Sequence, residues 1–285
     1  SKIKARLGGK LRILISGGAP LSEEIAEFFL AADIPIYQGY GLTETAPVIS
    51  VNYAGKNRLG SVGQPLSTLR LQLAADGELL VKGASVFKGY WKQPIQTAEA
   101  LQDGWFQTGD LAELDAEGFL HITGRKKDII VTAGGKNVAP QQIENELKAD
   151  KFISNVMVYG DQKPFLIALI VPDFAILQKY ANYKHLDFLD QSGLIKDAHT
   201  LDLIRRRIIS IQSSFPTYQQ IKRFTLLARD FSSEKGEVTQ TLKVKRNVVG
   251  KRFAQVIEDL YSSDPETIHK TGFCSINSET ELEKP

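Results

Sequence analysis

The residues from Tyr37 to Thr45 place an aromatic ring, a hydroxyl and a carboxylate within one short turn. Tyr40 could stack on a nucleotide base, Thr43 could donate to a phosphate, and Glu44 could hold a divalent cation, which prefers oxygen ligands. The apolar run before the turn is typical of a short strand, and open α/β sheets bind ligands at strand ends. The alternative is a glycine-rich turn whose Thr and Glu begin a helix. The turn alone does not decide between the two interpretations.

Three other segments could add to a nucleotide site, although each has a simpler interpretation. The small residues Gly17, Gly18 and Ala19 would let the backbone approach a ligand closely, or they form an ordinary turn. Asp110 follows an aromatic pair and could accept hydrogen bonds from both ribose hydroxyls, or it is a β-turn aspartate. Arg125 could donate to the same sugar, or it is a solvated surface arginine.

The hydrophobic pattern indicates the elements that position these residues. The first region has the pattern of a β-α-β unit, with strands at 11–15 and 34–37 and a helix between them that Ser22 would cap. From 69 to 122, short apolar runs separated by glycines predict a small antiparallel barrel or sandwich.

A charged stretch at 124–128 precedes a second region with the pattern of an α+β domain. A helix is expected after Pro140, which suits a first helical position. Strands are expected at 129–131, 156–159 and 166–171. Residues 262–285 are polar and aperiodic, and they predict a disordered tail that contains Cys274.

The composition excludes several classes of protein. The net charge of +2 over 285 residues gives no overall field for nucleic acid. Cys274 is the only cysteine, so no internal disulfide can form and a cytoplasmic location is expected. The four histidines are scattered and lack the spacing of a structural metal site. The longest apolar run, 165–171, is far shorter than the roughly 20 residues of a membrane span.

Taken in order, these segments resemble the acyl-adenylate-forming enzymes, the superfamily of acyl-CoA synthetases, firefly luciferase and peptide-synthetase adenylation domains. The resemblance spans 11–261, and the segment VTAGGKNVAP at 131–140 is similar to bacterial long-chain fatty acyl-CoA synthetases. The other motifs that carry it are ISGGAPL at 15–21, GYGLTE at 39–44, GELLVKG at 77–83, KGYW at 88–91, WFQTGD at 105–110 and GRKKD at 124–128.

The resemblance implies a role for each matching residue. Tyr40 would stack on adenine, Thr43 would contact the α-phosphate, and Glu44 would ligate magnesium. Asp110 and Arg125 would hold the ribose hydroxyls. The residues that would line the nucleotide pocket with their backbone are Gly17, Gly18, Ala19, Gln38, Gly39 and Gly41. Those assigned to the C-terminal part are Lys127 as the interdomain hinge, Gly134 and Gly135 in the loop that faces the pantetheine of CoA, and Lys243 as the catalytic lysine.

A lysine suits adenylation because the fatty carboxylate and the α-phosphate of ATP are both anions that must come together. The alternative is that Lys243, with the other basic residues at 245–252, forms a solvated helix face. Such a face could also touch anionic lipid at the membrane periphery. Many relatives carry Pro-Lys-Thr-x-x-Gly-Lys where this chain has EVTQTLK at 237–243, so Lys245 is a second candidate for the catalytic role.

The resemblance implies an α/β and α+β fold: a remnant of the large domain's α/β sheet (1–55), a small β-barrel subdomain (56–123) and a mobile α+β C-terminal domain (124–261). It implies a long-chain fatty acid–CoA ligase that uses ATP, magnesium and CoA, with acyl carrier protein as an alternative acceptor.

The Ser/Thr/Gly-rich phosphate loop of this superfamily does not occur in the sequence. We therefore expect a C-terminal part that is inactive alone, that requires the N-terminal half for a complete site, and that exposes a strand edge and apolar faces. A non-catalytic binding or assembly module is the remaining alternative.

Overall fold

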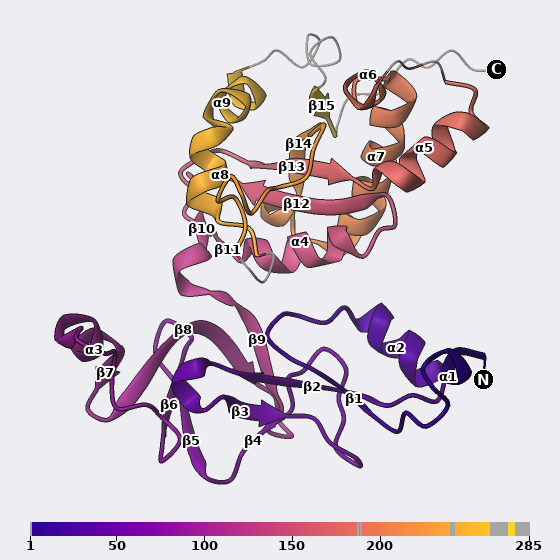
Figure 1. Ribbon diagram of the computed structural model, residues 1–285. Helices are drawn as coiled ribbons and strands as arrows, with labels where there is room; N and C mark the ends of the chain where they lie inside the picture. The colour runs from indigo at the N-terminus through magenta and orange to yellow at the C-terminus, as the bar shows by residue number, and fades with distance from the viewer. Residues whose placement is uncertain (1, 187, 189, 240–242, 263–272, 277–285) are drawn as a thin grey trace. The chain divides into compact units, whose positions relative to one another are not determined.

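The computed structural model describes residues 2–186, 188, 190–239, 243–262 and 273–276 (Figure 1). The chain divides into two compact units, Ser1–Lys127 and Asp128–Pro285. The second unit therefore begins at Asp128, four residues after the expected start of the C-terminal domain at Gly124. The reason is that the strand Leu120–Arg125 pairs within the first unit.

The first unit begins with the short helix α1 (Lys2–Arg6) and the predicted β-α-β arrangement. Strand β1 (Leu14–Ser16) pairs in parallel with β2 (Ile36–Gly41), and helix α2 (Glu23–Ala31) connects them. Ser22 occupies the N-cap position, although its side chain makes no capping hydrogen bond. Strands β3 (Val48–Val51) and β4 (Gln64–Pro65) complete a four-stranded sheet in the order β1-β2-β3-β4.

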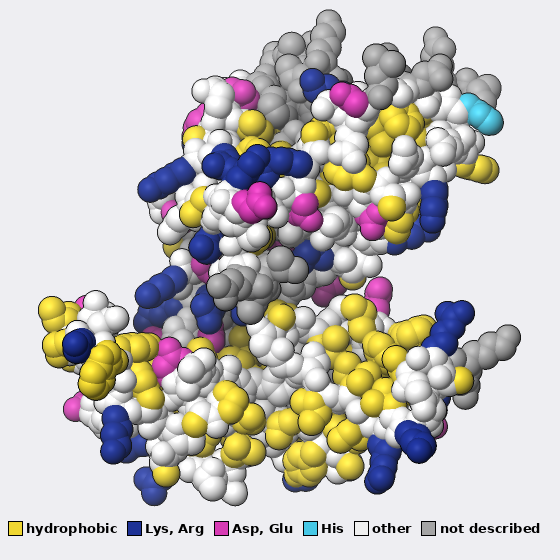
Figure 2. Space-filling model, viewed as in Figure 1, with side chains coloured by type: hydrophobic (Ala, Val, Ile, Leu, Met, Phe, Trp, Pro, Cys, Tyr) yellow, Lys and Arg dark blue, Asp and Glu magenta, His cyan; other side chains and the backbone are white. Residues whose placement is uncertain are grey.

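Much of the apolar surface around β1 and α2 is exposed. Ile15 is 71% exposed, and on α2 Ile25 is 49% and Phe28 is 56% exposed, whereas Ala26 is buried. Strand β1 is also the edge of its sheet. Hydrophobic side chains accordingly gather on the visible face of the first unit in Figure 2. The helix thus forms as predicted, and its apolar face is open, as expected for this part of the chain.

The rest of the first unit is the predicted antiparallel β subdomain. Its strands, in the order β5-β6-β8-β7 with β9 also paired to β8, are β5 (Leu69–Leu73), β6 (Glu78–Gly83), β7 (Leu101–Gln102), β8 (Trp105–Leu114) and β9 (Leu120–Arg125). Helix α3 (Pro94–Ala100) precedes β7. Buried Leu79, Val81, Ala112 and Leu120 pack together in its core. The long strand β8 pairs with β6, β7 and β9, so it joins three strands of the subdomain into one sheet.

The second unit is built on the mixed sheet β12-β13-β14-β15, in which only β13 and β14 run parallel. Every residue of β13 is buried, which explains its uninterrupted apolar sequence. One face of the sheet packs with α4 and α7, and the other with α8 and α9. The elements are β10 (Ile130–Val131), β11 (Asn137–Val138), α4 (Pro140–Lys148), β12 (Ile153–Tyr159), β13 (Leu166–Pro172), α5 (Phe174–Tyr183), α6 (Gln191–Leu194), α7 (Ala198–Ile211), β14 (Ile221–Leu226), α8 (Arg246–Arg252), α9 (Ala254–Ser262) and β15 (Phe273–Ser275). The predicted α+β pattern is confirmed.

The prediction of a disordered tail at 262–285 is wrong for its middle part. Strand β15 pairs antiparallel with β14, and Cys274 lies opposite Phe224 and is buried. Ser262 is the last residue of α9. Residues 263–272 and 277–285 lie outside the described residues. Within the part of the chain that is described, no helix has the length and apolar character needed to cross a membrane.

A buried carboxylate in the second unit predicts acid sensitivity. The Glu237 side chain accepts hydrogen bonds from the Arg229 guanidinium at 2.7 and 2.8 Å and from Arg252 at 3.0 Å. Arg229 is the largest cause that lowers the pKa of Glu237 from its ordinary 4.5 to about 2, and the Ser232 amide and Arg252 add to the effect. Because the folded-state pKa is the lower one, this stabilisation is complete above the unfolded pKa and is lost as pH falls through the folded value.

We therefore expect the urea midpoint of the wild type to fall more between neutral pH and about pH 3 than that of Glu237→Gln. The variant should start from a lower midpoint at neutral pH, because a neutral amide pairs poorly with two guanidinium groups. Equal pH dependence in both proteins would contradict the assignment.

Candidate functional site

The carboxyl ends of β1 and β2 bring the two predicted backbone segments of the nucleotide site together. Ser16 lies opposite Gln38 in the parallel pairing, so the Gly17–Ala19 turn leaves the sheet beside Gly39. A Cβ on Gly17 would lie 3.4 Å from the carbonyl oxygen of Gly39. Residues 17–19 are exposed, which leaves their backbone free to approach a ligand.

The turn after β2 is tightly constrained. A Cβ on Gly41 would lie 1.7 Å from the carbonyl oxygen of Pro47, so only glycine fits there. The next residues form the 3₁₀ turn η1 (Thr43–Thr45). The buried Thr45 hydroxyl donates to the Pro47 carbonyl at 2.7 Å and accepts from the Leu42 amide at 3.1 Å. Thr45 was not among the residues predicted to have a role, and it fixes the loop that presents the exposed Thr43 and the half-buried Glu44.

Glu44 is held by an aromatic residue from a distant segment. The Tyr90 hydroxyl donates to the Glu44 carboxylate at 2.9 Å, and the Phe87 amide donates to the Glu44 carbonyl oxygen at 2.8 Å. Partial burial and the negative charge of Glu44 raise the pKa of Tyr90, so it remains a neutral donor. The motif KGYW was noted only for its resemblance, and its tyrosine proves to orient the predicted magnesium ligand.

Tyr40, Asp110 and Arg125 form a second cluster, which we call the carboxylate clamp. The Tyr40 hydroxyl donates to Oδ2 of Asp110 at 2.6 Å, and Nε of Arg125 donates to Oδ1 at 2.9 Å. Asp110 is buried, and the pairing of β8 with β9 places it directly opposite Arg125. Burial and then the Asp110 charge raise the pKa of Tyr40 well above its ordinary value. Each carboxylate oxygen keeps lone pairs for a further donor.

An irregularity in β8 explains the sequence Thr-Gly-Asp. Glu78 pairs with Leu111 and Leu80 with Gln107, so the three residues Thr108–Asp110 lie opposite the single residue Leu79. Gly109 adopts a φ of 72°, which favours glycine. The Thr108 hydroxyl donates to the Leu79 carbonyl oxygen at 2.7 Å and accepts from the Asp110 amide at 3.1 Å. This bulge turns Asp110 toward Tyr40 and Arg125.

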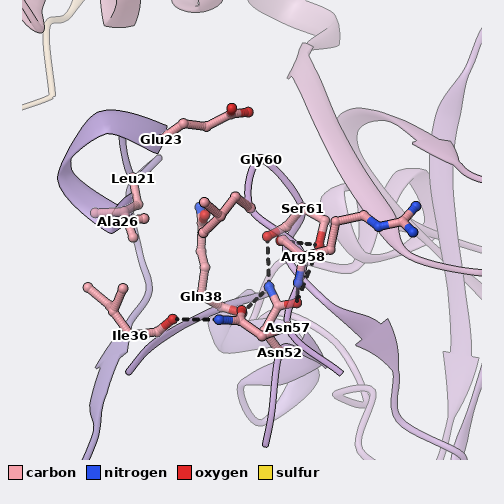
Figure 3. Close-up of a pocket in the computed structure, with 11 residues that line it drawn as sticks. Leu21, Glu23, Ala26, Ile36, Gln38, Asn52, Asn57, Arg58, Gly60 and Ser61 are labelled. Atoms are coloured by element: carbon pink, nitrogen blue, oxygen red, sulfur yellow. Dashed lines mark hydrogen bonds between the residues drawn. The ribbon is translucent and has the colours of Figure 1, made fainter. Parts of the chain in front are cut away.

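A small polar pocket lies between α2, β2 and the loop at 57–61 (Figure 3). The Asn52 side chain donates to the carbonyl oxygens of Gln38 at 3.2 Å and Ser61 at 2.8 Å. It also accepts from the Arg58 amide at 3.0 Å. The polar groups of this pocket hydrogen-bond to one another, and these bonds hold β2 to the loop at 57–61. The pocket lining does not include the clamp residues or Glu44.

The second unit carries the remaining predicted residues. Lys243 is exposed, its amide is 3.1 Å from the Thr239 hydroxyl, and its carbonyl oxygen accepts from the Thr239 amide at 2.8 Å. Gly134 and Gly135 form the exposed turn between β10 and β11, where Gly135 has a φ of 72°. Lys127 is exposed at the end of the first unit, and its role as a hinge stays a prediction.

The interpretation of 243–252 as a solvated basic face holds only in part. Arg246 and Arg252 are ion-paired, with Glu144 and Glu237 respectively. Lys243, Lys245 and Lys251 are exposed. Residues 240–242 of the motif lie outside the described residues. In the described part of this segment, the two arginines form ion pairs, whereas the three lysines are exposed.

The chain matches two family models: the AMP-binding enzyme over residues 1–91 and the AMP-binding enzyme C-terminal domain over residues 127–265. The long-chain-fatty-acid–CoA ligase FadD15 of Mycobacterium bovis is 43% identical over 267 residues, covering 92% of this chain and 44% of the relative. Human long-chain-fatty-acid–CoA ligase 1 is 34% identical over 280 residues, covering 92% and 40%. The chain therefore spans less than half the length of these relatives.

Solved structures show the same fold. The adenylation domain of a carboxylate reductase from Mycobacterium chelonae has a TM-score of 0.74 at 23% identity, covering 92% of this chain and 41% of that one. The O-succinylbenzoate CoA synthetase of Bacillus subtilis, in complex with AMP, has a TM-score of 0.63 at 24% identity, covering 86% and 48%. The predicted mixed α/β and α+β fold class is confirmed.

Proposed function

This chain belongs to the AMP-binding enzyme family, and we propose that it forms part of a long-chain fatty acid–CoA ligase. In the first step a fatty carboxylate oxygen attacks the α-phosphorus of ATP, and pyrophosphate leaves. In the second step the CoA thiolate attacks the acyl carbon of the adenylate, and AMP leaves with the electrons of the broken C–O bond. The names of the 43% and 34% identical relatives support this substrate class.

The observation that carries the proposal is the carboxylate clamp. Asp110 is buried with Tyr40 on one oxygen and Arg125 on the other, and an ionised carboxylate held in this way accepts further hydrogen bonds from vicinal hydroxyls. The two hydroxyls of a ribose are such a pair of donors. The bond to Asp110 fixes the Tyr40 ring, which would then present a face for adenine to stack on. Gly17–Ala19 and Gln38–Gly41 would border the same nucleotide.

The residues also fit magnesium. Mg²⁺ is usually bound by one or two carboxylates together with substrate phosphates, not by a complete protein cage. Glu44 is one such carboxylate, oriented by Tyr90, and Thr43 is exposed beside it. Among the described residues, no group of three or more His, Cys, Asp or Glu side chains could hold a metal ion by itself. When bound, the ion would neutralise phosphate charge.

The second unit would supply the remaining groups. We assign Lys243 to the adenylation step, Lys127 to the hinge, and Gly134 and Gly135 to the approach of the CoA pantetheine. The second unit would correspond to the mobile C-terminal domain, with Lys127 as its hinge. We further propose a cytoplasmic protein whose exposed lysines contact anionic lipid at the membrane periphery.

The direct test is release of pyrophosphate from ATP and magnesium by the protein that carries this chain. We expect release to depend on a long-chain fatty acid, and acyl-CoA to accumulate when CoA is added. Parallel reactions with CoA and with acyl carrier protein identify the acceptor. Absence of fatty-acid-dependent release would contradict the ligase assignment. A normal rate from the 285-residue chain alone would contradict the expectation that it needs an N-terminal half.

A further inference from the structure

Glu78 is a buried carboxylate beside the clamp that the proposed mechanism does not use. Its side chain is only 6% exposed at the start of β6. One oxygen accepts from the Gly109 amide at 2.9 Å, and the other accepts from Nζ of Lys126 at 2.7 Å. A buried carboxylate is costly unless both oxygens are satisfied, and here both are.

The two partners of Glu78 lie next to two of the three clamp residues, Asp110 and Arg125, in sequence. Gly109 precedes Asp110 in the bulge of β8, and Lys126 follows Arg125 at the end of β9. One carboxylate therefore ties the bulge to the end of the neighbouring strand. Lys126 is also the residue before Lys127, where the first unit ends.

The bulge depends on this acceptor. Three residues of β8 lie opposite Leu79 alone, so the regular ladder is interrupted there. The Gly109 amide points to Glu78, and the Thr108 hydroxyl satisfies Leu79 and Asp110. Without the Glu78 acceptor, Thr108 alone would hold the bulge that aims Asp110.

Asp76 provides an internal comparison. It contacts the same lysine, with its oxygen 2.6 Å from Nζ of Lys126, but its side chain is 50% exposed. It lies just before β6 and makes an ion pair that is open to solvent, which contributes little in general. Lys126 lowers the pKa of Asp76, so the pair is charged. Asp76 also accepts from the Glu78 amide at 3.2 Å, but among the described contacts it makes no hydrogen bond to the bulge residues 108–110.

We propose that Glu78 is a positioning residue that sets the Asp110–Arg125 spacing by holding Gly109 and Lys126 at once. The inference rests on the proposed function, because the ligand of the clamp is taken to be a ribose. Glu78 touches no substrate in this arrangement, and it acts through the backbone on either side of the clamp.

The test compares Glu78→Gln and Lys126→Met with Asp76→Asn as the matched control. Calorimetry measures the affinity of the 285-residue chain for AMP and for 2′,3′-dideoxy-AMP. The affinity for AMP divided by the affinity for 2′,3′-dideoxy-AMP reports the ribose contacts alone. We expect Glu78→Gln and Lys126→Met to lower this ratio roughly tenfold, the change that one lost hydrogen bond to a charged group produces. Asp76→Asn should leave it near the wild-type value.

Amide hydrogen exchange without nucleotide is the second readout. We expect faster exchange across 120–127 in Glu78→Gln, whose amide can still accept from the Gly109 amide but loses its ion pair with Lys126. Asp76→Asn should show no change. Exchange and ratio both at wild-type values in Glu78→Gln would overturn the proposal. Faster exchange with an unchanged ratio would overturn the positioning role while leaving the ligase proposal intact. A wild-type ratio near one would instead overturn the ribose assignment itself, and with it the positioning role.

Discussion

In the proposed ligase, replacing Lys243 by alanine is expected to slow fatty-acid-dependent pyrophosphate release by ~10²–10³-fold, the cost of removing one fixed electrostatic group from a transition state. The fatty carboxylate and the α-phosphate are both anions, and a placed ammonium offsets their repulsion as they meet. Lys243 is exposed, so the substitution removes little packing. We expect the loss in kcat at saturating substrates, measured in the protein that carries this chain.

Lys245→Ala is the matched control for this result. Lys245 is exposed two residues away, and its amide donates to the Glu237 carbonyl oxygen at 2.7 Å, a bond that alanine keeps. It should retain a rate within a few-fold of the wild type. If Lys243→Ala kept a normal rate while Lys245→Ala lost it, the catalytic role would move to Lys245.

The sequence was sufficient for elements whose hydrophobic pattern is set by burial. The apolar run at 165–171 became β13, buried throughout, and Pro140 begins α4, whose Ile143 and Leu147 are buried. The β-α-β unit was also predicted correctly. The apolar face of α2 is exposed, although its helical spacing was the same. Periodicity therefore identifies a helix, but it does not say what covers the apolar face within this chain.

The clamp shows why site geometry was only partly predictable. Asp110 and Arg125 were each found as candidates, but their contact depends on the register of β8 against β9. Tyr40 reaches Asp110 from 70 residues away. Glu78 lies in the motif GELLVKG and Tyr90 in the motif KGYW, but the sequence alone did not predict a role for either residue. The one available signal for Glu78 was a carboxylate directly before the apolar run Leu79–Val81.

The tail was misread because β15 is short and its neighbours in sequence are polar. Pairing with β14 buries Cys274 in the hydrophobic core of the second unit. Burial raises the pKa of the Cys274 thiol to about 12, so this thiol stays protonated and has low nucleophilicity at neutral pH. Three residues in a polar segment carry too weak a pattern to predict a strand.

Arg246→Met is expected to destabilise the second unit by about 3–5 kcal/mol at neutral pH, because it leaves a buried carboxylate without its cation. Arg246 pairs with the buried Glu144 and also donates to the Val158 carbonyl oxygen at 2.9 Å. Glu144 accepts from the Val158 amide at 2.7 Å. Val158 lies on β12, the edge of its sheet, so the pair satisfies both backbone groups that the edge leaves open.

The loss should depend on pH in a defined direction. Burial raises the pKa of Glu144, and Arg246 opposes this rise, so the variant should have a higher Glu144 pKa than the wild type. An acid whose folded-state pKa lies above its unfolded value favours folding below the unfolded value and loses that contribution as pH rises. Arg246→Met should therefore be least destabilised in acid, as measured by urea unfolding across pH.

Two further variants make the interpretation specific. Arg206→Met breaks the pair with Asp202, in which Arg206 is 62% exposed. It should cost at most about 0.5 kcal/mol, because the buried Asp202 keeps its ion pair with Arg205. The double variant Glu144→Gln with Arg246→Met removes the buried charge together with its partner. It should be more stable than Arg246→Met at neutral pH, because an amide at Glu144 can still accept from Val158 without an uncompensated charge. Equal destabilisation of the single and double variants would show that lost packing, and not the buried carboxylate, controls the stability of this edge.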